Sequence, residues 1–159
     1  MKSIVRGTAL LLVAAAFAVS AGSAQAETTW GPRAGMSFNP DQIALGAHVQ
    51  LPLATNFYIV PNADVAFGDD AFTISLNGDV AYRFQSESSV RPYLGAGFSY
   101  FNFDVDTEGP GDSSFSEAGV SVLGGVWLNA SGSTPFFIEG KLFLSDQLPD
   151  FKVMAGVNL

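Results

Sequence analysis

From Thr29 to Leu159, polar and apolar residues alternate with a period of two. This pattern predicts β-strands, because successive side chains of a strand point to opposite faces. Eight such segments are separated by clusters of turn-forming residues, which predicts an all-β fold of antiparallel strands. The segments are Thr29–Phe38, Ile43–Leu51, Phe57–Phe67, Phe72–Phe84, Arg91–Phe103, Phe115–Leu128, Pro135–Ser145 and Phe151–Leu159.

The residues before the first strand have a different character. Lys2 and Arg6 precede an apolar run from Ala9 to Val19, and Ala24-Gln25-Ala26 follows. A basic start, a short apolar stretch and an Ala-x-Ala sequence are typical of a secretory signal peptide. The run is shorter than the ~20 apolar residues that a spanning helix requires. We therefore predict a signal peptide over residues 1–26.

The remaining chain, residues 27–159, has the length of one domain. Removing Lys2 and Arg6 from the seven basic residues leaves five, against fifteen acidic residues, so the net charge is −10. This charge argues against binding to nucleic acid, which favours basic surfaces. The chain has no cysteine, so neither disulfides nor thiolate metal sites are expected. No motif for a cofactor is present.

The alternation fits two architectures, which place the polar face of the strands on opposite sides. A soluble barrel turns its polar face to water, whereas an outer-membrane barrel turns it inward and its apolar face to lipid. Only 14% of the residues are charged, fewer than the ~25–35% of a typical soluble surface. All five basic residues fall on the polar face of a strand, where acids can pair with them in a closed interior. The predicted interior ion-pair network is Arg33, His48, Asp64, Asp79, Arg83, Arg91, Glu117, Glu139, Lys141 and Lys152.

Aromatic residues gather near the strand ends on the apolar face, with smaller residues between them. This arrangement predicts two aromatic girdles at the edges of a lipid-facing band. The predicted girdle residues are Trp30, Phe38, Phe57, Phe67, Phe72, Tyr82, Phe84, Phe136 and Phe151. An outer-membrane barrel is therefore favoured over a soluble periplasmic one, which remains the alternative and predicts extraction without detergent.

Repeated strand motifs such as Arg91-Pro92-Tyr93-Leu94-Gly95-Ala96-Gly97, together with an amphipathic last strand, carry a resemblance to a known group. The chain resembles the small eight-stranded outer-membrane β-barrels of the outer-membrane protein A/X and opacity-protein type. The resemblance implies an up-and-down barrel in the outer membrane of a Gram-negative bacterium, with both termini in the periplasm. It departs from the group at Leu159, where such barrels usually carry an aromatic residue.

The connections expected to face outward are acidic, and the segment with Asp104, Asp106, Glu108 and Asp112 is the longest of them. Its first half copies the spacing of a calcium loop, but Phe115 stands where the loop requires Glu. We therefore expect a solvated acidic loop, which shares divalent ions with lipopolysaccharide phosphates, and no specific metal site.

These observations predict a structural or surface-interaction protein without catalysis or cofactor. The predicted partners are outer-membrane lipids and lipopolysaccharide, with an extracellular partner at the loops, and a monomer is expected. A narrow channel or carrier for a small apolar molecule is one alternative. A lipid-modifying enzyme is another, because some such barrels use a histidine with serine and an acid, and His48 is the one histidine here. We expect His48 instead to join the interior hydrogen bonds, near Gln50 and Asp64.

Overall fold

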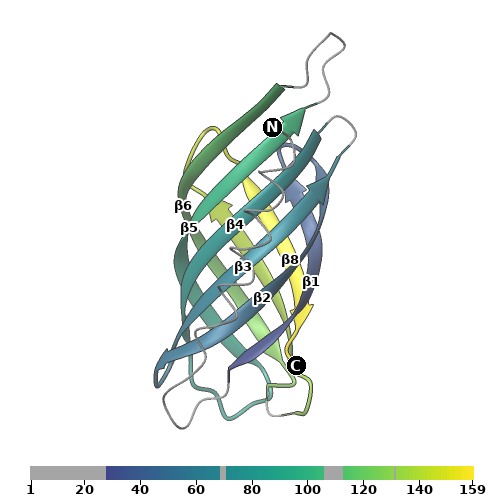
Figure 1. The fold of residues 1–159 in the computed structure, drawn as a ribbon. Coiled ribbons are helices and arrows are strands. Elements are labelled where there is room, and N and C mark those ends of the chain that lie inside the picture. Colours follow the sequence, from purple (N-terminus) through teal and green to yellow (C-terminus); the bar gives the residue numbers. More distant parts are fainter. Residues whose placement is uncertain (1–27, 69–70, 106–112, 131) are drawn as a thin grey trace.

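The computed structural model describes residues 28–68, 71–105, 113–130 and 132–159. The predicted signal peptide lies outside these ranges. The strands are β1 (Thr29–Phe38), β2 (Gln42–Ala54), β3 (Phe57–Phe67), β4 (Ala71–Arg83), β5 (Arg91–Val105), β6 (Ser113–Leu128), β7 (Phe136–Phe143) and β8 (Phe151–Val157). They form a closed antiparallel barrel in sequence order, which β8 completes by pairing with β1 (Figure 1). The predicted all-β, eight-stranded fold is confirmed. No helix in the described ranges is long and apolar enough to cross a membrane.

The alternation sorts the side chains into an interior and an exterior face. On β1, Arg33 is buried, whereas its neighbours Pro32 and Ala34 are exposed. Large apolar side chains cover the outside, and Ile43 and Leu94 are 61% and 58% exposed. A soluble barrel would bury these residues, because exposing so much apolar surface to water is unfavourable. The apolar face is therefore the outer face of the barrel.

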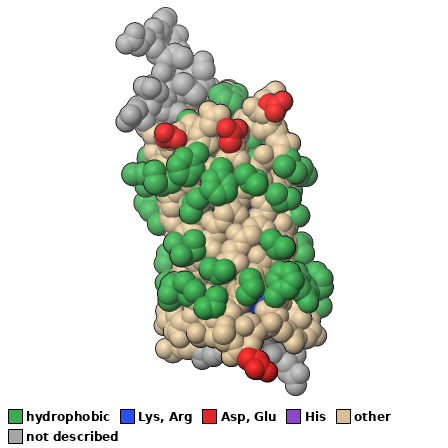
Figure 2. Space-filling model, turned by 180° about the vertical axis from the view of Figure 1, so that it is seen from behind, with side chains coloured by type: hydrophobic (Ala, Val, Ile, Leu, Met, Phe, Trp, Pro, Cys, Tyr) green, Lys and Arg blue, Asp and Glu red, His purple; other side chains and the backbone are tan. Residues whose placement is uncertain are grey.

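The exposed hydrophobic side chains are not spread evenly over the outer surface. On the face seen in Figure 2 they form two bands across the barrel, with acidic side chains beyond the bands at the ends. This distribution matches the layered environment of a bilayer, where large residues sit at the interfaces and charge stays in water.

The two ends of the barrel are distinguished by the connections between strands that lie there. At the end where β1 begins and β8 finishes, here called the terminal end, the chain connects β2 to β3, β4 to β5 and β6 to β7 (Figure 1). At the other end, here called the loop end, it connects β1 to β2, β3 to β4, β5 to β6 and β7 to β8.

Several strand limits differ from the predicted ones by one to three residues, and two of these differences change how a connection is described. Pairing of β5 with β6 continues through Asp104 opposite Ser114, so Asp104 is an exposed strand residue rather than part of a loop. β7 ends at Phe143 rather than Ser145, because the chain then turns and brings Leu148 back into the loop end of the barrel, where it is 3% exposed. The turn is closed by the Leu148 amide, which donates to the Ser145 carbonyl at 3.1 Å.

Candidate functional site: the polar interior of the barrel

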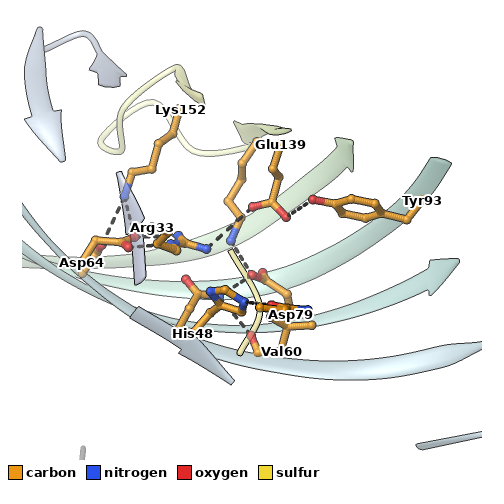
Figure 3. A network of polar contacts seen from close by, with 12 residues as sticks. Arg33, His48, Val60, Asp64, Asp79, Tyr93, Glu139 and Lys152 are labelled. Atoms are coloured by element: carbon orange, nitrogen blue, oxygen red, sulfur yellow. Dashed lines mark hydrogen bonds and ion pairs between the residues drawn. The ribbon is translucent and has the colours of Figure 1, made fainter. Parts of the chain in front are cut away.

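The centre of the interior is a carboxylate held by two cations. Arg33 on β1 donates from Nε and Nη2 to the two oxygens of Asp64 on β3, at 2.7 Å each. Lys152 on β8 donates from Nζ to Asp64 Oδ2 and to Ser75 Oγ on β4, both at 3.2 Å (Figure 3). A fork of two parallel hydrogen bonds is among the strongest contacts that a guanidinium makes. These contacts join four strands, β1, β3, β4 and β8, from the two ends and the middle of the sequence.

A second ion pair crosses the barrel beside the first. Lys141 on β7 donates from Nζ to Asp79 Oδ2 on β4 at 2.6 Å, and Asn62 on β3 donates to the same oxygen at 2.7 Å. Gly97 on β5 lies opposite Asp79 in the sheet. A Cβ at Gly97 would collide with Asp79 Oδ1. The interior therefore makes room for the carboxylate by having no side chain on the neighbouring strand.

Glu139 on β7 links the ion pairs to the terminal end. It accepts a hydrogen bond from Tyr93 Oη at 2.9 Å, and its Oε1 lies 3.8 Å from Arg33 Nη1 (Figure 3). With Glu139, three carboxylates face three cations, so the charges of this ion-pair layer sum to zero. Burying an isolated charge is costly, and mutual pairing offsets that cost.

Apolar clusters lie on both sides of the ion-pair layer. The loop-end cluster consists of Phe101, Phe103, Phe143 and Leu148. The terminal-end cluster consists of Ala81, Tyr93, Leu123, Trp127 and Phe137. A cavity of about 20 Å³ lies beside the second cluster, enough for one or two water molecules. Side chains therefore fill the interior across its length, as expected for a barrel of this strand number.

His48 on β2 faces the interior but does not contact the ion pairs. Its Nε2 lies 2.6 Å from Asn158 Oδ1, and its ring meets the edge of Phe137 with centroids 5.0 Å apart. The expected proximity to Asp64 is not seen among its hydrogen bonds. Asn158 was not among the predicted network residues, although a period of two from Lys152 reaches it.

Three further predicted network residues stand apart from the ion-pair layer. Arg83 contacts Gln50 and Tyr58 at the terminal end. Arg91 has no ion pair with any described residue. Glu117 lies at the loop end of β6, beside the amide of Gln147. Alternation therefore assigned the face of these residues, but not their partners.

The predicted girdle residues all lie on the outer face, where several touch one another across strands. Phe57 and Tyr82 have ring centroids 5.0 Å apart, and Phe67 and Phe72 have centroids 5.3 Å apart. Such cross-strand aromatic pairs stabilise neighbouring strands. Three more exposed aromatic residues, Phe98, Tyr100 and Phe115, were not in the predicted girdle. The alternation from Arg91 onward would have found the first two.

Of the predicted acidic loop, Asp106, Glu108 and Asp112 lie outside the described residues, and Asp104 is exposed on β5. Within the described ranges, no group of three or more histidine or acidic side chains is arranged to hold a metal ion.

No family model matches the chain, and no curated protein does so either. Solved structures do match. The N-terminal β-barrel domain of OprF from Pseudomonas aeruginosa aligns with a TM-score of 0.70 at 11% identity, covering 82% of this chain and 94% of that one. Neisserial surface protein A aligns with a TM-score of 0.61 at 19% identity, covering 83% and 92%. The outer membrane enzyme PagL aligns with a TM-score of 0.51 at 13% identity, covering 83% and 97%.

The chain thus has the fold of the small eight-stranded outer-membrane β-barrels, as the sequence predicted. Likeness at such low identity speaks for the fold alone. The environment of the barrel follows from its surfaces. A closed barrel with an apolar outer face and a polar, ion-paired interior suits a bilayer. The protein is a transmembrane β-barrel of the outer membrane.

Proposed function

We propose that the protein is a non-catalytic barrel that presents its loop end at the cell surface to a partner and contributes to the structure of the envelope. The observation that carries the proposal is the filled interior. Between the two apolar clusters, six charged groups are engaged with one another, which favours a rigid scaffold over a conduit.

The loop end supports a role in surface interaction. Its exposed charges in the described ranges are acidic: Asp41, Asp104, Asp146 and Asp150. Asn39 Nδ2 donates to Asp150 Oδ2 at 2.9 Å, and the Asp150 amide donates to the Phe38 carbonyl at 3.1 Å. These bonds join the β1–β2 connection to the β7–β8 connection and hold part of the acidic surface in a fixed shape. A fixed surface loses less entropy when a partner binds.

The orientation and the surface role are tested together. An epitope inserted at Asp146 should be reached by antibody on intact cells, whereas the same epitope at Glu87, in the connection at the terminal end, should be reached only after the outer membrane is opened. The protein should fractionate with the outer membrane and migrate faster on a detergent gel before boiling than after. Labelling at Glu87 on intact cells would reverse the orientation and overturn the proposal.

Transport is a second candidate, and the small cavity near the terminal end is the observation that favours it. Apolar and aromatic side chains such as Leu123 and Trp127 line part of the cavity, and charged side chains such as Arg33 and Glu139 line the rest. Its volume of about 20 Å³ is too small for an apolar ligand unless the side chains move. Planar-bilayer recordings separate the two proposals. A scaffold gives no steady conductance, and a steady ion current would favour the channel.

A lipid-modifying activity is a third candidate, because the outer membrane enzyme PagL shares the fold. The surroundings of His48 support the non-catalytic proposal. Its partner Asn158 is an amide rather than an acid, and its ring packs on Phe137. Expressing the protein should leave the lipid A and phospholipid profiles unchanged. A modified lipid that disappears with His48→Ala would establish the enzyme.

A further inference from the structure

Two arginines at the terminal end carry positive charge that no described carboxylate balances. Arg83 ends β4 and Arg91 begins β5, and the pattern of each strand turns both toward the interior. The ion-pair layer is neutral without them, and neither takes part in its ion pairs. Glu87, in the connection between the two strands, is exposed and pairs with neither arginine. Neither guanidinium is therefore paired with a carboxylate of the described residues.

The two guanidinium groups share one wall of the barrel. Arg91 lies opposite Trp127 in the pairing of β5 with β6. The Arg83 guanidinium carbon lies 4.9 Å from the centroid of the Trp127 ring. Arg83 is opposite Tyr93, two residues along β5 from Arg91, and such diagonal neighbours on one face have Cα atoms about 7–8 Å apart. The two arginines therefore start from neighbouring positions on the interior face of β4 and β5, and Arg83 reaches the ring of Trp127, the residue opposite Arg91.

Neighbouring polar groups hold Arg83 in place without neutralising it. Its Nη2 donates to Gln50 Oε1 at 2.9 Å, and its guanidinium carbon lies 4.2 Å from the centroid of the Tyr58 ring. The Nε atoms of Arg83 and Arg91 are both buried without a protein acceptor. Each of these two half-buried guanidinium groups therefore keeps an N–H donor that no protein group satisfies.

We propose that Arg83 and Arg91 form an anion-binding site at the terminal mouth of the barrel, with a phosphate group as its ligand. A guanidinium binds phosphate through paired hydrogen bonds, and an anion between two like charges removes their repulsion. The phosphate comes from a phospholipid headgroup of the adjacent leaflet or from free phosphate. The assignment does not depend on which face of the membrane the terminal end occupies.

The test is an NMR titration of the ¹⁵N-labelled barrel that records the guanidinium Nε–H signals. Inorganic phosphate is added at constant ionic strength, with chloride as the competing anion. The barrel is held in decyl maltoside, a detergent that has no phosphate. We compare the wild type with Arg83→Gln and Arg91→Gln. Thr134→Glu is the matched control, because it changes the net charge by the same amount at an exposed position of the same end. The mobility shift on boiling confirms that each variant is folded.

We expect a saturable shift in the wild type, at least a tenfold loss of phosphate affinity in each arginine variant, and less than a threefold loss in Thr134→Glu. In phospholipid nanodiscs, signals that are already shifted before phosphate is added identify the headgroup as ligand. Signals that match those in detergent identify free phosphate. The proposal is overturned by the absence of any saturable shift in both media. It is also overturned if Thr134→Glu weakens binding as much as Arg91→Gln, which would mean diffuse electrostatics only.

Discussion

Lys141 Nζ lies 2.6 Å from Asp79 Oδ2, although the two residues are 62 positions apart in sequence and their strands, β7 and β4, are not neighbours in the sheet. The contact therefore runs through the interior of the barrel. It connects opposite walls of the barrel directly, as the contact of Lys152 on β8 with Ser75 on β4 also does.

Asp79→Asn should destabilise the barrel by about 3 kcal/mol, because it leaves the buried Lys141 ammonium without its counter-charge. Urea unfolding in lipid vesicles, followed by tryptophan fluorescence, measures this loss. The double variant Asp79→Asn/Lys141→Met should recover most of the stability, because no buried charge is then left unpaired. If the double variant is as unstable as the single one, the pair does not act as a unit.

Gly97→Ala should cost about 1–3 kcal/mol by overpacking, because the new Cβ collides with the Asp79 carboxylate. The same unfolding assay measures the cost. Gly78→Ala is the matched control, since a Cβ at that outer-face position meets no atom within 4 Å. Equal effects at the two positions would show that the glycine opposite Asp79 has no special role in packing.

Ala96→Arg should cost about 2–4 kcal/mol, because Ala96 lies midway along the outer face of β5, where the bilayer is most apolar. Leu53→Arg, near the terminal end of β2, should cost only about 0–1 kcal/mol, because a long cationic side chain reaches the interface there. The yield of barrel folded into vesicles is the second readout. If both variants fold as well as the wild type, the outer face does not meet lipid.

Leu148→Ala should destabilise the barrel by about 2 kcal/mol or more, because Leu148 closes the loop-end cluster with Phe101, Phe103 and Phe143. The connection from β7 to β8 should then open more often, and limited proteolysis between residues 144 and 150 should accelerate. Asp146→Ala, at an exposed neighbouring position, should leave stability within about 0.5 kcal/mol of the wild type. Unchanged proteolysis in Leu148→Ala would mean that the connection is held by its backbone bonds alone.

The sequence was sufficient for the strands and for the face of each side chain, because both follow from a period of two. Arg33 and Lys141 were assigned inward by this rule, and both are buried. The partners were not predictable in the same way. Asp64 meets Arg33 and Lys152, and His48 meets Asn158, because the stagger of the closed barrel sets which interior residues share a level.

The return of Leu148 into the barrel was missed for a related reason. Ser145-Asp146-Gln147-Leu148 has the composition of an ordinary turn, and Leu148 packs inward because Phe101, Phe103 and Phe143 offer an apolar surface there. These side chains come together only once the barrel has closed, so the local sequence around Leu148 does not predict that it packs inward.

The fit between Gly97 and Asp79 has a consequence for how such barrels diverge. A larger residue at position 97 becomes acceptable once position 79 becomes smaller, and the charge of Lys141 must then be matched from elsewhere. Change in the interior therefore proceeds in compensated sets of residues, while the outer face accepts almost any apolar exchange. Widely different sequences can therefore share one backbone, and the OprF domain has this fold at 11% identity and a TM-score of 0.70.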